Sequence, residues 1–439
     1  MGKRKKLRKR NILCLCLVLL VAALNGAAWI SPAFPDWYIK YIFPLWVGTY
    51  GRVTGLFRFS VGEWMIVAGL LLLAAAAVLA ALWAGLGVAA AAGYVRRIVV
   101  GKAGKNLCGN KEAGTGGTTE QMGEKGRGPA AGDRKRFPVM FRKFSGIFWR
   151  FFGWTILTVS LIMTLNCFIL YHASTFSEQY FGGNEEEYTL EELMAVYNLV
   201  AGQCNRLAGA MERDRSSMVL YKDSNGDSGN LEDMADKARE LMRQLGEDYP
   251  QLQGYYPRPK ALHFSDFMCQ QRMQGYYFPF SMEANYNDVM HILNIPATMC
   301  HELAHLRGYI YEDEANFIGY LACVESEDIF FQYAGYLSVL VYLNNDLYRA
   351  WKEEPEAYEE AAAVMHPVAV DAIVWEDNIF VTEEEWERIN GKALIDTEIV
   401  DKAADVFIDT NLKINGIRDG KISYSRVVSL LLQYYRHQA

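Results

Sequence analysis

Three long stretches of the chain are apolar and contain no charged side chain, and they restrict the fold more than any other feature. They are residues Asn11–Pro35, Trp64–Val95 and Phe151–Ser177. Each contains the roughly 20 apolar residues that an α-helix needs to cross the hydrocarbon core of a bilayer. The sequence therefore predicts three transmembrane helices, at about 11–31, 64–90 and 151–173. A signal peptide cleaved near Ala27 is the alternative for the first stretch.

Basic residues are distributed unevenly around these stretches. Seven precede the first stretch, three lie between the first and second, and thirteen lie between the second and third. Because loops rich in Lys and Arg stay on the cytoplasmic side of a membrane, we expect the N-terminus and the long loop to be cytoplasmic. Three spans then place residues 178–439 outside the cytoplasm, after a membrane region of residues 1–177. Residues 101–136 lack aromatic side chains and are rich in Gly and Lys, which predicts a disordered cytoplasmic linker.

The rest of the chain is strongly acidic. Of 44 Lys/Arg and 51 Asp/Glu residues, 23 and 6 lie in residues 1–150, which leaves 21 basic and 45 acidic residues for 151–439. Nucleic-acid binding requires clustered basic side chains on a folded face, so we expect no nucleic-acid partner. Membrane lipid is an expected partner because of the three spans. No feature of the sequence predicts an oligomeric state.

The pattern after residue 178 predicts a mostly α domain of the α+β class. Thr189 and Glu192 form a capping-box pattern, and apolar residues then recur at helical spacing. Residues 254–286 are rich in aromatic side chains among Gly and Pro, which predicts short strands of a small antiparallel sheet. Further predicted helices are Leu231–Gly246, Glu312–Glu327, Ile329–Trp351, Glu356–Met365, Glu383–Ile389, Glu398–Asn411 and Tyr424–Arg436.

One motif in this domain has the residues of a metal site. His301-Glu302-Leu303-Ala304-His305 places two histidines four residues apart, so on a helix both imidazoles lie on one face and can bind one Zn²⁺ ion. Glu302 beside them is the expected catalytic base, which takes a proton from a water molecule whose pKa the metal lowers. Two ordinary helix histidines are the alternative. The apolar residues around them predict a buried helix, in which unpaired polar side chains are costly.

A third ligand leaves one open position on a tetrahedral zinc ion. Tyr311 stands where the pattern HExxHxxGxxH has its third histidine, which disfavours that class. Glu312 and Glu314 follow at the start of the next predicted helix. The run Asp313-Glu314-Ala315-Asn316 resembles the signature with which gluzincin peptidases present a glutamate ligand. We therefore predict Glu314 as the third ligand, with Glu312 in reserve; an acid that only interacts with the helix dipole is the alternative for each.

Three segments carry a resemblance to a known family. HELAHLRGYIYEDEANFIGYLAC at 301–323, GYYFPFSMEANYN at 275–287 and ISYSRVVSLLL at 422–432 resemble the domain of unknown function 3810 family of bacterial membrane proteins. The resemblance is expected to cover the three spans and most of the rear domain. It implies a gluzincin-like zinc metallopeptidase fold. In that comparison residues 276–280 form an edge strand that binds an extended peptide, with Tyr277, Phe278 and Phe280 as substrate-binding residues. A buried aromatic strand is the alternative.

These observations predict a membrane-anchored zinc metallopeptidase that acts on a peptide or protein substrate. Two other hypotheses remain. One is a non-catalytic membrane sensor or scaffold that retains a zinc site, which the long cytoplasmic linker suggests. The other is a zinc hydrolase of a non-peptide substrate in the cell envelope, since the motif specifies the metal and the base but not the substrate pocket.

Overall fold

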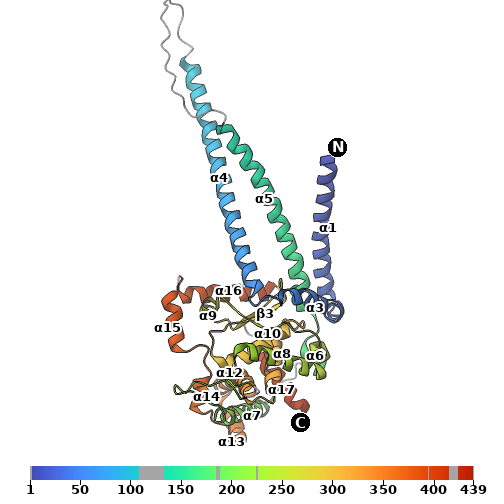
Figure 1. Ribbon diagram of the computed structural model, residues 1–439, viewed down its shortest axis with the longest axis vertical. Coiled ribbons are helices and arrows are strands. Elements are labelled where there is room, and N and C mark those ends of the chain that lie inside the picture. The colour runs from blue at the N-terminus through green and yellow to red at the C-terminus, as the bar shows by residue number, and fades with distance from the viewer. Residues whose placement is uncertain are drawn as a thin grey trace, which may run out of the picture. The chain divides into compact units, whose positions relative to one another are not determined.

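The computed structural model describes residues 2–107, 133–183, 188–223, 226–393, 395–414 and 424–438 (Figure 1). Contacts divide the chain into two compact units. One unit joins Met1–Trp64 to Val159–Ala439, and the other is Met65–Thr158. The division therefore differs from the expected boundary at residue 177. The reason is that the segment before the second apolar stretch folds together with the rear of the chain.

Among the described residues, three helical stretches are long and apolar enough to cross a membrane, in agreement with the three predicted spans. They are Lys9–Ile30, Val61–Leu86 and Met140–His172. Their apolar surfaces indicate that the protein associates with a membrane. The helices themselves are longer: α1 (Gly2–Ile30), α4 (Val61–Leu107), and α5 (Asp133–Met163) with the π-helical turn η1 (Thr164–Phe168) and the 3₁₀ turn η2 (Leu170–His172) after it.

The predicted linker 101–136 is partly helical. Helix α4 continues to Leu107 and α5 begins at Asp133, so both ends of the predicted linker belong to helices. Residues 108–132 lie outside the described residues. The described ends of the predicted linker, residues 101–107 and 133–136, are therefore helical rather than disordered.

Two short helices between the first two spans pack onto the rear of the chain. They are α2 (Ala33–Tyr41) and α3 (Phe43–Thr54). Ile39 of α2 lies against Gly308, and Gly51 of α3 lies against Met282. Their buried side chains, among them Phe43 and Val47, belong to the same hydrophobic core as the rear helices. Burial of these apolar side chains holds residues 31–60 in the first unit.

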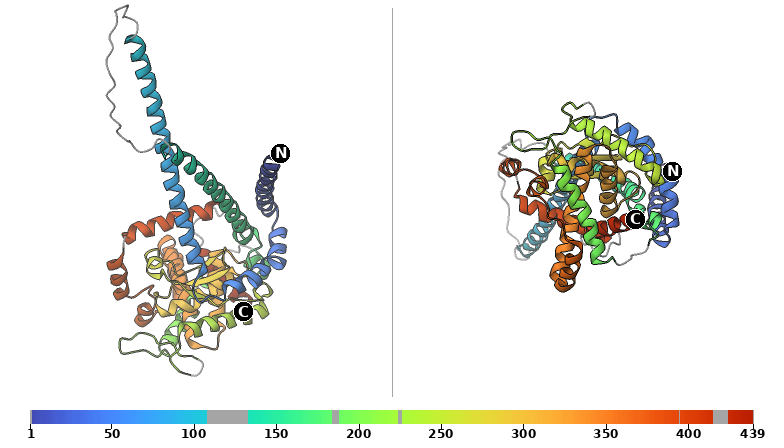
Figure 2. Two further views of the ribbon diagram at one scale, coloured as in Figure 1. Left: turned by 45° about the horizontal axis from the view of Figure 1, so that its top comes forward. Right: turned by 90° about the horizontal axis from the view of Figure 1, so that it is seen from below.

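The rear of the first unit is mostly helical, as predicted (Figures 1 and 2). Helix α7 starts at the predicted capping box, in which Thr189 and Glu192 each accept a backbone N–H from the other. The helices are α6 (Phe176–Tyr180), α7 (Leu190–Ala208), α8 (Leu231–Asp248), α9 (Ser265–Gln270), α10 (Ile295–His305), α11 (Glu312–Val324), α12 (Ile329–Glu353), α13 (Pro355–Met365), α14 (Ala372–Asp377), α15 (Glu383–Lys392), α16 (Thr397–Ile414) and α17 (Tyr424–Gln438), with 3₁₀ turns η3 (Pro250–Leu252) and η4 (Ile292–Asn294).

A small sheet lies beside α10, and its topology differs from the prediction. Its strands are β1 (Lys260–Ala261), β2 (Gly275–Phe278) and β3 (Glu283–Tyr286), in the order β1-β3-β2. The β2–β3 pair is antiparallel, as expected, but β1 runs parallel to β3. The sheet is therefore mixed, because α9 and β2 lie between β1 and β3 in the chain and return it to the same direction. Strand β2 is at the edge, as predicted.

A buried ion pair joins this sheet to the start of α4. Lys260 of β1 and Glu283 of β3 contact each other and are both almost completely buried. The Lys260 Nζ also donates to the carbonyl oxygen of Thr54 at 2.8 Å, and Glu283 accepts the backbone N–H of Gly62 at 2.8 Å. These hydrogen bonds satisfy both buried charges, as a buried pair requires. The pair therefore attaches the sheet to the segment that connects α3 with α4.

Candidate metal centre

Helix α10 carries the motif and lies in the interior of the first unit. It contacts α8, α11, α12 and the sheet. Pro296 is in its first turn, where the missing N–H of proline costs nothing. After His305 the chain turns at Gly308, whose φ of +96° is readily adopted only by glycine. This turn directs the chain back, so that α11 packs along α10 and its first residue lies beside the two histidines.

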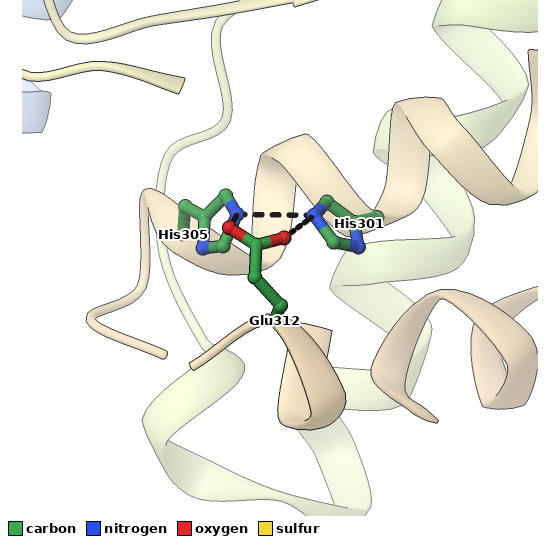
Figure 3. Close-up of side chains that lie close together, drawn as sticks. All are labelled: His301, His305 and Glu312. Carbon is green, nitrogen blue, oxygen red and sulfur yellow. Dashed lines mark hydrogen bonds and ion pairs between the residues drawn. The ribbon is translucent and has the colours of Figure 1, made fainter. Parts of the chain in front are cut away.

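Three side chains converge between α10 and α11 (Figure 3). The Nε2 atoms of His301 and His305 are 3.1 Å apart. The Glu312 carboxylate lies 3.1 Å from Nε2 of His301 and 3.9 Å from Nε2 of His305. In a tetrahedral zinc site with bonds of 2.0–2.1 Å, neighbouring ligand atoms are about 3.3 Å apart. The separations of these three donors therefore fit a single zinc ion.

The second ring nitrogen of each histidine faces a hydrogen-bond acceptor. Nδ1 of His301 lies 2.8 Å from Oδ1 of Asn316, and Nδ1 of His305 lies 2.6 Å from the carbonyl oxygen of Tyr309. These contacts favour a proton on each Nδ1 and leave the Nε2 lone pairs directed at each other. Two lone pairs at 3.1 Å repel unless a cation or a proton lies between them. Hydrogen bonds from Nδ1 to an amide or carbonyl oxygen are the contacts that orient imidazoles in metal sites.

The pKa values of the metal-free protein show how the site compensates for burial. Burial lowers the pKa of His301, but the hydrogen bond and charge of Glu312 outweigh this effect and leave the pKa at about 9. Burial and the neighbouring His301 lower the pKa of His305 to about 4. Near neutral pH the metal-free site therefore carries its positive charge on His301, while His305 stays neutral. The Glu312 side chain is 55% exposed, which opens the site to solvent on that side.

Glu302 occupies a buried position against the edge strand. Its Oε2 atom has no hydrogen-bond partner among the described residues. Its Oε1 atom lies so close to Gly275 of β2 that a Cβ atom at residue 275 would be 2.7 Å away. Burial raises the pKa of this carboxyl group to about 8. A buried carboxylate oxygen without a partner is costly, and such exceptions are typical of functional groups that interact with a ligand.

The structure corrects the predicted third ligand. The Glu314 carboxylate points away from the two imidazoles and accepts the backbone N–H of Phe176. Residues on a helix advance by about 100° each, so Glu312 and Asn316, four apart, share the face toward α10, whereas Glu314 projects from the opposite side. The signature comparison therefore favoured an acid two residues too late in the chain, and Glu312, the reserve residue, is the one that lies beside the imidazoles. Tyr311 is not directed at the site, since its hydroxyl donates to the carbonyl oxygen of Tyr171.

The three predicted substrate-binding side chains pack against neighbouring segments. The Tyr277 hydroxyl donates to the carbonyl oxygen of Asn166, and the ring of Phe278 lies on Gly62 and 5.3 Å from the ring of Phe280. These contacts match the alternative of an aromatic strand that supports the fold. Of the three, Tyr277 comes nearest to the histidines, with its ring centre 6.0 Å from that of His305.

The backbone of β2, by contrast, has a free edge among the described residues. The N–H of Asn287 donates to the carbonyl oxygen of Gln274, so Gln274 forms a hydrogen-bonded pair with the chain that continues from β3. In an antiparallel ladder the bonded side alternates along a strand. Gly275 and Tyr277 therefore turn their N–H and C=O groups outward, and Gly275 lies against Glu302.

Sequence reasoning did not single out two residues of this site. One is Asn316, which orients His301; its spacing of four from Glu312 was the available signal. The other is Gly275, which leaves room for Glu302. Only the pairing of β2 beside α10 shows why a glycine is required there, so no local pattern points to it.

A family model described as Protein of unknown function (DUF3810) matches residues 134–432. The chain belongs to this family. The match starts at residue 134, so the first two apolar stretches lie outside it, which corrects the expectation that the resemblance covers all three. The motif, β2 and all three converging side chains lie within the matched part of this DUF3810 protein. No curated protein and no solved structure matches the chain.

The Asn316 contact predicts a measurable loss of metal affinity. Replacing Asn316 with Ala removes the acceptor that orients His301, and outer-shell partners of this kind are worth roughly 10–100-fold in affinity. We expect a loss of that size for Zn²⁺ in competition with a chromogenic chelator. Asn205→Ala is the control, because Asn205 bonds to Ala369 and Asp371 instead. Equal losses in both variants would contradict an orienting role for Asn316.

Proposed function

We propose that this DUF3810 protein is a membrane-anchored zinc metallopeptidase. The observation that carries the proposal is the convergence of His301, His305 and Glu312 next to the buried Glu302 carboxylate, whose Oε2 atom has no hydrogen-bond partner among the described residues. Zinc bound by these three side chains would act as a Lewis acid and lower the pKa of a water molecule. The donor set of two imidazoles and one carboxylate is typical of catalytic rather than structural zinc sites.

Glu302 performs the proton transfers in this mechanism. Its carboxylate takes a proton from the attacking water molecule and then gives it to the nitrogen of the leaving amine. Gly275 allows this carboxylate to lie against β2, where the substrate binds. A scaffold that retains zinc for structure alone gives no role to an unpartnered buried carboxylate, so the catalytic function is better supported than the sensor.

The outward backbone groups of β2 favour a peptide as the substrate. An extended peptide adds to a free sheet edge through main-chain hydrogen bonds. Gly275 and Tyr277 present such groups beside Glu302, and this arrangement would hold the scissile bond near the base. A sugar or lipid substrate makes no use of a strand edge.

The charge distribution supports an extracytoplasmic location of the site. The basic N-terminus and the basic loop between α4 and α5 favour the cytoplasm, which leaves the chain after α5 on the other side. The substrate would then be a peptide or protein outside the cytoplasm.

Removal and return of the metal test this proposal. The full chain in phospholipid nanodiscs should bind one zinc ion and cleave members of an extended-peptide library. We expect chelation of the zinc to abolish cleavage and stoichiometric zinc to restore it, with products identified by mass spectrometry. Cleavage that persists in the metal-free protein, or a zinc-loaded protein that cleaves no peptide of the library, would refute the proposal.

A further inference from the structure

The segment between the first two apolar helices is tethered to the membrane at both ends. Helix α1 ends at Ile30 and α4 begins at Val61, and both are long and apolar enough to cross a bilayer. Two consecutive spans return the chain to the side where it left. Residues 31–60 therefore stay at one surface of the bilayer.

This short segment exposes an unusual number of large apolar side chains. Nine of them are more than a third exposed within residues 31–60, against thirteen among the described residues of the far longer stretch that begins at 178. The most exposed is Leu56 at 81%, and Trp37, Leu45, Val53 and Phe59 are about half exposed. Aromatic and aliphatic side chains of this kind are stabilised at the boundary between headgroups and acyl chains.

Helix α9 extends this apolar surface from the first turn of α4. The carboxylate of Glu63 accepts the backbone N–H groups of His263 and Phe264, both at 2.9 Å. These bonds hold the start of α9 beside the residue where the second apolar span begins. The rings of Phe264 and Phe267 are nearly half exposed there. Together with the exposed side chains of residues 31–60, they extend an apolar patch of the kind that marks an interaction site.

Helix α16 continues the surface beyond α9. The side-chain amide of Gln270, the last residue of α9, donates to the hydroxyl of Thr397 at 3.1 Å. On α16, Ile399 and Val406 are 62% and 68% exposed and lie seven residues apart, on one face of the helix. Figure 1 shows α3, α9 and α16 at the end of the first unit that carries α1, opposite α13.

We propose that these elements form a lipid-docking face that lies in the bilayer interface. The face comprises α2, α3, residues 55–60, α9 and the exposed stripe of α16. Its partner is the phospholipid bilayer itself, because chain continuity holds residues 31–60 at the bilayer surface and Glu63 connects α9 to the same place. The exposed apolar side chains are then removed from water.

The docking face also determines where the metal centre lies. Ile39 of α2 packs on Gly308, the turn that follows His305, and Lys260 ties the sheet to the carbonyl oxygen of Thr54. The site is thus attached directly to elements that lie on the bilayer. Substrates would be limited to chain segments close to the membrane surface, a consequence that rests on the proposed peptidase function. The docking face itself does not depend on that function.

Collision accessibility of spin labels tests the docking face. The full chain, with Cys14, Cys16 and Cys108 replaced by Ser, is placed in phosphatidylcholine nanodiscs with one nitroxide label at Phe267 or Ile399. A label at Val364 on α13, which is 73% exposed, is the control. We expect the ratio of accessibility to oxygen over a water-soluble nickel complex to be several-fold higher at Phe267 and Ile399 than at Val364. Labels at Phe264 and Val406 repeat the measurement on the same two helices.

Two results would overturn the docking face. Ratios equal to that at Val364 would show that α9 and α16 face water. Labels shielded from both reagents, together with a dimer in native mass spectrometry, would show that a second copy of the chain covers the surface. Neither result bears on zinc binding or peptide cleavage, so the docking face and the proposed function can fail separately.

Discussion

Replacing Glu302 with Gln is expected to lower peptide turnover about 10²–10⁴-fold, the usual contribution of a positioned general base. Glutamine has nearly the same shape as glutamate, so it fits between α10 and Gly275 of β2. Its neutral side-chain amide cannot accept a proton from the water molecule. The variant should still bind one zinc ion, because Glu302 is not among the three converging donors. Turnover of an identified peptide and zinc content by mass spectrometry measure the two properties separately.

Glu325→Gln is the matched control for this experiment. Glu325 follows the last residue of α11 and accepts a hydrogen bond from the hydroxyl of Tyr434, which glutamine can replace. Its turnover should equal that of the parent. A Glu302→Gln variant that cleaves as fast as the parent would exclude Glu302 as the base. Loss of zinc together with activity would instead point to a structural role for this carboxylate.

Glu312→Gln and Glu314→Gln should differ sharply in zinc affinity. Glutamine at 312 removes the carboxylate that lies within reach of both imidazoles. We expect a loss greater than the roughly 10–100-fold caused by removing an outer-shell partner. Glutamine at 314 still accepts the backbone N–H of Phe176, and its affinity should stay close to that of the parent. Titration against a chelator of known affinity gives both values.

Stability measurements separate metal binding from folding in this pair. The Glu312 side chain is 55% exposed, so its replacement removes little packing, and the loss of its ion pair with His301 should lower the unfolding temperature of the metal-free protein only modestly. Glu314 is buried, so its variant is expected to unfold at the lower temperature of the two. The opposite affinity pattern, with zinc lost at Glu314→Gln, would restore the ligand that the signature comparison indicated.

Local sequence patterns predicted the parts of this protein that depend on local spacing. Charge-free apolar stretches predicted three helices long and apolar enough to cross a membrane, because helix length and hydrophobicity are properties of consecutive residues. The capping box at Thr189 predicted the start of α7 for the same reason. The two histidines of the motif lie on one helical face, as the spacing of four requires. Matching segments also led to the family that the family model shows.

The packing of α11 on α10 decides which acid lies beside the two imidazoles. The sequence alone offered both Glu312 and Glu314. Both Glu312 and Glu314 stand in the first turn of α11, and a comparison of signatures favoured the wrong one. The rotation of α11 about its own axis decides which acid faces α10. That rotation follows from contacts on the whole helix, such as Gly319, whose missing side chain lets α11 approach the backbone of α10 at Ala297.

The sequence by itself determined the three apolar helices, the helical character of the rear domain and the pair of imidazoles one turn apart, since each follows from the order of neighbouring residues. Only the tertiary structure decided that β1 runs parallel to β3, that Gly275 leaves room for Glu302, and that residues 31–60 fold with the rear of the chain. These features join segments that are distant in sequence. Their geometry comes from close packing and the satisfaction of buried polar groups, which no short stretch of residues encodes.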